Sequence, residues 1–193
     1  ESRKILKNHH KANTVLLRGF SKLPDLPSMA DRYCLNPAAI AAYPMYRGLA
    51  SLVGMKVIDT GTEFSQELET LRNHFGDHDF FYIHYKPADA AGEDGDFSAK
   101  VKALETLDTY IPELMELSPD VFIVAGDHAT PSVLASHSWH PVPFLINSKL
   151  TTGEGIKAFN EKDCVMGSIG QISATHVMLL ALANGDKLTK FGP

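Results

Sequence analysis

The sequence VFIVAGDHATP, which runs from Val121 to Pro131, sets the expected fold of the whole chain. It opens with apolar residues that are mostly β-branched or aromatic, and such a run is typical of a strand buried on both faces in a parallel sheet. The run stops at Gly126, so Asp127 and His128 follow the carboxyl end of the strand, where open α/β sheets bind ligands. A carboxylate beside an imidazole predicts a site for a divalent cation. The alternative is a turn in which Asp127 caps the next segment.

Apolar periodicity elsewhere predicts alternating strands and helices. Strands are expected at 38–43, 55–59, 80–85 and 142–146, and helices at 44–53, 62–75, 97–117 and 172–183. Met45 and Leu49 should lie on the apolar face of the first helix, and Pro112 should kink the third or divide it in two. Upstream, the pattern indicates the end of a helix at 1–8, a strand at 13–20 and a proline-rich loop or domain crossing at 21–37. The alternation from residue 38 onward predicts an α/β layered fold with a mostly parallel sheet.

The length of 193 residues allows one sizeable domain, with or without a smaller appendage. The formal net charge of −5 provides no basic surface, which argues against a nucleic-acid partner. No apolar run approaches the ~20 residues that span a membrane. The two cysteines, Cys34 and Cys164, lie far apart in the sequence and indicate reduced thiols in a cytoplasmic protein. Because the chain starts without methionine, in what resembles the middle of a helix, we expect it to be part of a longer protein.

An acidic segment, DAAGEDGD at residues 89–96, is expected to form a loop after the strand at 80–85. Its four carboxylates repel one another unless a cation or solvent relieves them. An EF-hand calcium loop is excluded, because its sixth position is Asp94 rather than glycine and its twelfth is Lys100 rather than glutamate. Asp96 fits an N-cap of the next helix. Asp89 and Glu93 are left as candidate metal ligands, and the alternative is a solvated acidic loop.

A third segment, HSWHPVP at residues 137–143, enters the strand at 142–146. Either His137 or His140 could reach a metal, and the alternative is that both are solvated. Three segments that follow successive strands thus offer carboxylate, carboxylate–imidazole and imidazole groups, and together they predict a metal site. Oxygen and nitrogen donors without a thiolate suit Mn²⁺, Zn²⁺ or Mg²⁺.

Three basic residues near these segments are candidates for holding a phosphate group. Lys86 directly precedes the acidic segment, Arg47 lies close to an expected helix start, where backbone amides also favour anions, and Arg18 precedes Gly19. The alternative for each is an ordinary surface cation.

At five places the sequence resembles the 2,3-bisphosphoglycerate-independent phosphoglycerate mutases, in the shorter form typical of archaea and some bacteria. The matching segments are Leu16–Gly19, Ile40–Gly54, His84–Asp96, Gly126–Pro131 and His137–Pro143. The resemblance covers essentially the whole chain and implies an alkaline-phosphatase-like layered fold. It further implies that residues 34–193 form the C-terminal half of the metal-binding core, and that residues 1–33 are the tail of an inserted substrate-binding domain.

The resemblance implies two divalent cations, with manganese expected and Mg²⁺, Zn²⁺ or Co²⁺ as alternatives. One cation would be held by Asp89, Glu93 and His137, with Glu93 standing where longer relatives have histidine. The other would be held by Asp127 and His128, together with an aspartate and a nucleophilic serine upstream of this chain. By its distance from the first proline of its segment, His137 fits the family pattern better than His140. Arg18, Arg47 and Lys86 are the residues expected to contact the substrate.

The implied reaction is the interconversion of 2-phosphoglycerate and 3-phosphoglycerate in glycolysis and gluconeogenesis, through a phosphoserine. Because the serine is expected upstream, this chain would contain no nucleophile and would be inactive without the N-terminal half of the same protein. Thr130 and Ser132 are the only hydroxyls that adjoin the Asp–His pair, and Thr130 is expected to make a turn or cap hydrogen bond. Two alternatives stay open: another phosphomutase or phosphatase of the alkaline phosphatase superfamily, and a non-catalytic metal-binding fragment.

Overall fold

Strand β1 (Pro37–Ile40) lies at the centre of a three-stranded sheet in the order β2-β1-β3. It pairs in parallel with β2 (Lys56–Ile58) on one edge and with β3 (Phe80–Ile83) on the other. Residues 38–40 have no exposed surface, because helices cover both faces of the sheet. The predicted α/β fold with a parallel sheet is confirmed, and each of these strands is shorter than predicted.

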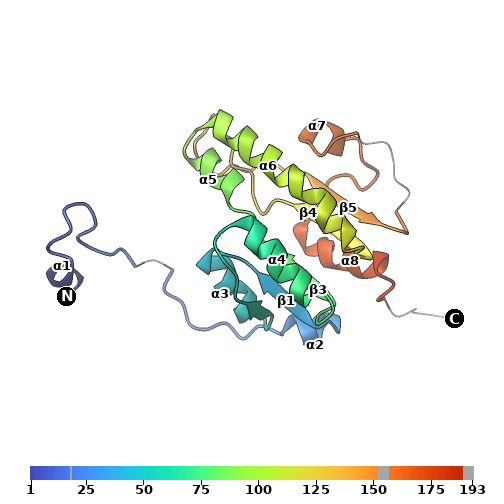
Figure 1. Cartoon of the computed structure of the whole chain (residues 1–193), viewed down its shortest axis with the longest axis horizontal. Helices are drawn as coiled ribbons and strands as arrows, with labels where there is room; N and C mark the ends of the chain where they lie inside the picture. The colour runs from blue at the N-terminus through green and yellow to red at the C-terminus, as the bar shows by residue number, and fades with distance from the viewer. Residues whose placement is uncertain (18, 152–156, 189–193) are drawn as a thin grey trace.

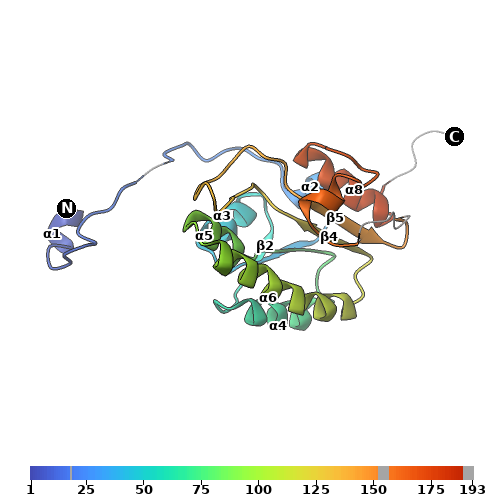
Figure 2. The same ribbon diagram turned by 90° about the horizontal axis from the view of Figure 1, so that it is seen from above.

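The two faces of this sheet bury separate apolar clusters, because successive side chains of a strand point to opposite sides. Ala38 and Ile40 face α4 (Phe64–His74) and α6 (Phe97–Glu116). Ala39 faces α3 (Pro44–Leu52). Figure 2 shows α4 and α6 side by side on one face of the sheet and α3 on the other.

The helices begin where the sequence contains start signals. Pro44 occupies the first turn of α3, Glu63 and Gln66 form a capping box at α4, and Asp96 accepts the Ala99 amide at α6, 2.9 Å away. Leu68 and Leu71 of α4 are buried in the core, as expected for the apolar face of an amphipathic helix.

Helix α6 runs through Pro112 as one element, so the expected division is wrong, and the alternative of a kink stays a prediction. Two further expectations for the helices were wrong. Met45 and Leu49 of α3 are 61% and 55% exposed, because the sheet meets the side of this helix that carries Ala50. The start of the acidic segment belongs to a helix, α5 (Pro87–Glu93), where Pro87 in the first turn and three alanines favour helix over loop.

Strand β4 (Val121–Ala125) forms where it was predicted, but it does not pair as predicted. Within the described ranges it pairs only with β5 (Phe144–Ser148), in a separate antiparallel sheet in which Ile123 lies opposite Ile146. It is half-buried rather than buried on both faces. Its Phe122 packs against the core of the parallel sheet, and α8 (Val177–Asn184) lies against its other side. Among the described residues, β3 and β4 each keep one unpaired edge.

The computed structural model describes residues 1–17, 19–151 and 157–188 (Figure 1). Helix α1 (Ser2–Ile5) lies at the end of an extended arm that reaches the body of the molecule at α2 (Met29–Tyr33). The strand predicted at 13–20 is not formed in the described part of that segment, where Val15, Leu16 and Leu17 are 57–80% exposed. A strand needs a hydrogen-bonded neighbour, and the arm has none among the described residues.

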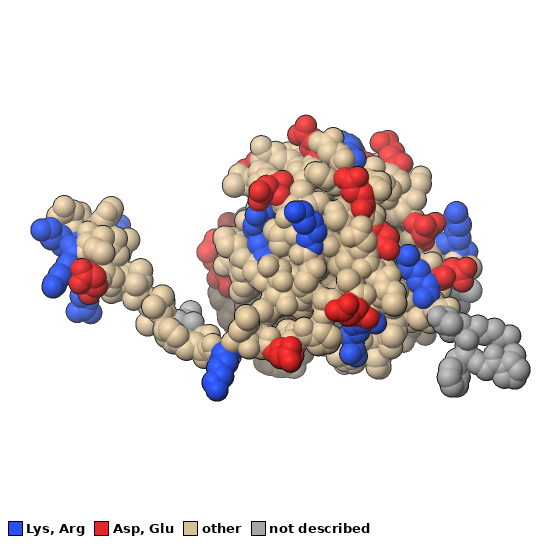
Figure 3. All heavy atoms as spheres, turned by 90° about the horizontal axis from the view of Figure 1, so that it is seen from below, with Lys and Arg blue, Asp and Glu red and all other residues tan. Residues whose placement is uncertain are grey.

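Three further short elements lie in the described chain. Helix α2 forms inside the predicted loop, because Ser28 caps it and the Met29 amide donates to the carbonyl of Val53, 2.9 Å away. Helix α7 (Glu161–Cys164) and a 3₁₀ turn (Ala174–His176) precede α8, so the predicted helix at 172–183 starts later than expected. In the described ranges, no helix has the length and apolar character needed to cross a membrane. On the face seen in Figure 3, acidic and basic side chains are intermingled.

Candidate metal centre

Three segments bring candidate ligands together. Asp89 lies on α5, shortly after β3; His128 follows β4; and His137 lies in the loop that leads to β5. This loop is held against the segment after β4 by a hydrogen bond of 2.9 Å from the amide of Ser138 to the carbonyl of Ala129. One ligand atom from each of Asp89, His128 and His137 lies within 4.8 Å of the other two.

The two distances from Asp89 to the histidines of this cluster suit a shared cation. Oδ1 of Asp89 lies 3.8 Å from Nδ1 of His128 and 3.8 Å from Nε2 of His137. An ion at ~2.1 Å from each donor allows two donors to lie up to ~4.2 Å apart. The two imidazole rings stack with 3.8 Å between their centroids, so each fixes the direction of the other. Carboxylate and imidazole donors of this kind fit Mn²⁺ or Zn²⁺.

The other two predicted ligands lie at the border of the cluster. Oε1 of Glu93 is 3.3 Å from Nε2 of His137, and Oδ2 of Asp127 is 3.5 Å from Nε2 of His128. All five predicted ligands are therefore contiguous. The geometry groups His128 with Asp89 and His137, which differs from the division into two ligand sets that the family resemblance implies.

Asp89 is held by hydrogen bonds to both of its carboxylate oxygens. Lys86 binds Oδ2, and its amino group also lies 3.5 Å from Oε2 of Glu93. The hydroxyl of Thr130 donates to Oδ1 at 2.6 Å. Burial alone would raise the pKa of Asp89, but the hydrogen bonds from Lys86 and Thr130 outweigh it and hold this pKa below its ordinary value. Asp89 is thus kept ionised and in a fixed orientation.

Thr130 has a larger role than the turn or cap that its position predicted. It is 4% exposed, and its hydroxyl lies 3.0 Å from Nδ1 of His128 as well as bonding Asp89. Helix α5 approaches it closely at Gly92, where an added Cβ would lie 2.3 Å from the carbonyl oxygen of Thr130. Thr130 therefore bridges two of the cluster residues, and glycine at position 92 permits the contact. No local sequence signal pointed to this bridge.

Tyr46 of α3 is, after Thr130, the second supporting residue that the sequence did not suggest. Its hydroxyl donates a hydrogen bond to the carboxylate of Asp127. Burial alone would raise the pKa of Asp127, but the hydrogen bond from the Tyr46 hydroxyl and the charge of His128 hold it below its ordinary value. The ring of Tyr46 stacks on that of His84, with 3.7 Å between their centroids.

The three basic residues predicted to contact a phosphate group do not lie together. Lys86 lies at the cluster. The guanidinium group of Arg47 is instead bound to Asp59 at 2.6 Å and to the carbonyl oxygens of Ala41 and Ile58, none of which belongs to the cluster. Arg18 lies outside the described residues.

His140, the alternative to His137, lies outside the three-residue cluster. Its Nδ1 is 2.9 Å from the hydroxyl of Ser138, and its ring stacks on Trp139 with 4.9 Å between centroids.

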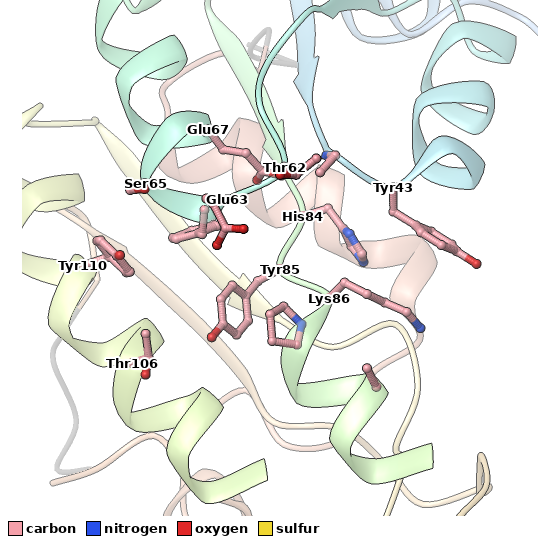
Figure 4. A pocket seen from close by; sticks show the side chains of 14 residues that line it. Tyr43, Thr62, Glu63, Ser65, Glu67, His84, Tyr85, Lys86, Thr106 and Tyr110 are labelled. Carbon is pink, nitrogen blue, oxygen red and sulfur yellow. The ribbon is translucent and has the colours of Figure 1, made fainter. Parts of the chain in front are cut away.

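A cavity of about 510 Å³ adjoins Lys86, and neither His128 nor His137 is among the residues that line it. Figure 4 shows Glu67, His84 and Lys86 around it. Glu67 is 2% exposed; its Oε1 accepts the amide of Ala42 at 2.8 Å, while its Oε2 has no hydrogen-bond partner in the described structure. Burial raises the pKa of Glu67 to about 7 and lowers that of His84. A carboxyl group that keeps its proton well above the usual pH range therefore lies against the loop that follows β1.

Comparison with known sequences agrees with a metal centre. Residues 4–184 match a family model described as the metalloenzyme superfamily. A protein of Thermotoga petrophila, named probable 2,3-bisphosphoglycerate-independent phosphoglycerate mutase, is 53% identical over 188 residues. The match covers 97% of this chain and 47% of that protein. The chain thus spans about half the length of the curated relatives it matches.

Solved structures support the fold. A protein from Pyrococcus horikoshii superimposes with a TM-score of 0.87 at 26% identity, over 91% of this chain and 57% of that one. The cofactor-independent phosphoglycerate mutase of Thermoplasma acidophilum matches with a TM-score of 0.66 at 21% identity, over 84% of this chain and 39% of that one, which supports the fold alone. The resemblance noted in the sequence is confirmed: the chain belongs to the metalloenzyme superfamily and is homologous to proteins named 2,3-bisphosphoglycerate-independent phosphoglycerate mutase.

Proposed function

We propose that this chain is the C-terminal part of a metal-dependent phosphoglycerate mutase, which interconverts 2-phosphoglycerate and 3-phosphoglycerate through a phosphoserine. The observation that carries the proposal is the convergence of Asp89, His128 and His137 from three separate segments to within 4.8 Å. The printed names of the relatives supply the substrate and the reaction. In the whole protein, this activity would serve glycolysis and gluconeogenesis in the cytoplasm.

The cluster would hold two divalent cations, with manganese the metal we propose. Bound there, divalent cations lower the pKa of a nucleophile and neutralise charge on a transferring phosphoryl group. The residues of this chain act as ligands and as supports for ligands. Lys86 and Thr130 fix Asp89, and Lys86 also carries a positive charge to the edge of the cluster, where a phosphate oxygen could accept its remaining N–H group.

We propose that residues 34–193 form the C-terminal half of the metal-binding core and that residues 1–33 are the tail of an inserted substrate-binding domain. Two features support a partner in the missing part of the protein. The arm exposes Leu16, Leu17 and Phe20 by 67–83%, which a free chain in water does not favour. The edges of β3 and β4 are unpaired in the described structure, and a free edge can accept a further strand. The N-terminal half would supply the nucleophilic serine and an aspartate.

The test is a turnover assay of the 193-residue chain, with and without the separately expressed N-terminal half, using manganese and 3-phosphoglycerate. We expect no mutase activity from the chain alone, because Thr130, the buried hydroxyl beside the Asp–His pair, is already bound to Asp89. Adding the N-terminal half should restore activity, and product analysis will distinguish 2-phosphoglycerate from the free phosphate that a phosphatase would release. Turnover by the chain alone that is lost in Thr130→Ala would overturn the assignment of the nucleophile to the missing half.

A further inference from the structure

We propose that Tyr46 is a positioning residue for Asp127, which it holds in the orientation that binds a divalent cation. This inference rests on the proposed function, since it requires a metal at Asp127. Tyr46 lies in the first turn of α3, and its phenol hydroxyl donates a hydrogen bond to Oδ2 of Asp127, 81 positions further along the chain. The bond joins a helix packed on the parallel sheet to the loop that follows the antiparallel strand β4.

The direction of this hydroxyl is set by aromatic neighbours. The ring of Tyr46 stacks on the imidazole of His84 with 3.7 Å between centroids and 26° between planes. It is also tilted against Tyr82 at 6.3 Å and against Tyr43 at 6.0 Å. Tyr82 lies on β3 and His84 directly follows that strand. Aromatic pairs favour defined ring orientations, so these contacts with residues on and directly after a strand of the parallel sheet fix the ring that points at Asp127.

The carboxylate of Asp127 is consequently held at both oxygens. Oδ1 accepts the backbone amide of His128 at 3.0 Å, and Oδ2 accepts the hydroxyl of Tyr46. Among the described residues, Tyr46 is the only one whose hydroxyl group is hydrogen-bonded to Asp127. Each carboxylate oxygen can accept more than one interaction, so a lone pair of Asp127 stays free to bind a cation while Tyr46 and His128 keep the group from rotating.

Partners that orient a metal ligand in this way matter for affinity. Loss of such a partner typically lowers metal affinity by about 10–100-fold. A phenol is protonated at neutral pH, so Tyr46 offers a donor that strengthens the hold on Asp127 without occupying the metal itself. The expected function of Tyr46 is therefore to set how tightly the cation is bound and in which geometry.

Tyr43 provides a matched control. It lies three positions earlier, belongs to the same aromatic group and is 41% exposed. Its hydroxyl makes no hydrogen bond in the described part of the chain. The substitution of either tyrosine by phenylalanine removes one oxygen atom and keeps the ring contacts, so both variants should fold, which circular dichroism will verify.

The experiment measures Mn²⁺ affinity by calorimetry and the visible spectrum of bound Co²⁺, in the 193-residue chain and in the variants Tyr46→Phe and Tyr43→Phe. We expect Tyr46→Phe to bind Mn²⁺ about tenfold more weakly and to shift the Co²⁺ spectrum, which reports ligand geometry and which a general loss of stability would not move. Tyr43→Phe should match the wild-type chain in both measurements.

The outcomes separate this inference from the proposed function. If the wild-type chain binds neither Mn²⁺ nor Co²⁺, the metal centre itself is wrong. If the wild-type chain binds both and Tyr46→Phe shows the same affinity and spectrum, only the role of Tyr46 is overturned. Equal losses in Tyr46→Phe and Tyr43→Phe would also overturn it, because the effect would then belong to the aromatic group as a whole.

Discussion

The hydroxyl of Thr130 donates a hydrogen bond of 2.6 Å to the carboxylate of Asp89, although 41 positions separate the two residues. Through this bond the loop after β4 holds a side chain of α5, a helix that follows a strand of the other sheet. The protein therefore fixes the orientation of the ligand side chains before a metal binds to them.

Replacing Asp127 by asparagine should weaken Mn²⁺ binding by at least about tenfold, because it removes a charged ligand from the cluster. The fold should be retained, since the asparagine carbonyl can still accept the hydroxyl of Tyr46. Calorimetry measures the affinity and circular dichroism the fold. Unchanged affinity in a folded Asp127→Asn chain would contradict the metal centre.

The two histidines of the loop before β5 should differ in importance. His137→Ala should reduce Mn²⁺ affinity more than His140→Ala, because only the imidazole of His137 lies within 4.8 Å of the donors on Asp89 and His128. His140 is the natural control, since it lies three positions away on the same loop. A larger loss in His140→Ala would mean that the loop presents the other histidine to the metal.

Replacing Thr130 by valine should lower the free energy of unfolding of the metal-free chain by about 1 kcal/mol, since it removes a hydrogen bond to a partly buried acceptor on Asp89. Mn²⁺ affinity should fall as well, because Asp89 loses one of its two supports. Thr106→Val is the control, because the hydroxyl of Thr106 donates to the carbonyl of Lys102 on the same helix and contacts no residue of the cluster in the part of the chain that the structure describes. Urea unfolding and calorimetry measure the two effects, and equal results for both variants would refute a special role for Thr130.

Glu67 should make the stability of the chain fall as the pH rises from about 4.5 to about 7. Its pKa rises from the ordinary 4.5 to about 7 on folding, so within this window the unfolded chain loses a proton that the folded chain keeps. The free energy of unfolding should drop by up to roughly 3 kcal/mol across the window and then level off.

Glu67→Gln tests this expectation, because glutamine has no proton to release. Urea unfolding at several pH values should show a smaller fall in Glu67→Gln than in the wild-type chain, whereas Glu69→Gln, which alters an exposed carboxyl on the same helix, should follow the wild type. A pH profile that is identical in the wild-type chain and in Glu67→Gln would disprove the shift.

Local apolar patterns predicted the positions of the elements better than their partners. Val121–Ala125 is a strand, as its composition indicated. An apolar run reports that a strand is buried, however, and not which strand lies beside it, so the antiparallel pairing with β5 could not be foreseen. The segment at 13–20 failed for a related reason, because β-branched and leucine residues favour a strand only when a neighbour is present.

The candidate ligands could be predicted for a different reason. Asp89 and His128 each follow a strand closely, and the carboxyl ends of strands gather at one side of an α/β fold. The prediction attributed this to one sheet, whereas the two residues follow strands of separate sheets. The supports could not be predicted, because Tyr46 and Thr130 meet their carboxylates across 81 and 41 positions, and no local pattern encodes a hydrogen bond over that distance.

The separation of the strands into two sheets gives a bound cation a mechanical consequence. Asp89 follows a strand of the parallel sheet, whereas His128 and His137 lie in the segments beside the antiparallel sheet. No strand hydrogen bond joins the two sheets in the described structure. A cation held by all three residues would therefore cross-link them. Metal at one hundred times its dissociation constant stabilises a protein by about 2.7 kcal/mol. In this protein the binding energy would oppose movement of one sheet relative to the other. Phe122 of the antiparallel sheet packs against the core of the parallel sheet. Amide hydrogen exchange near Phe122 should therefore slow when metal is added.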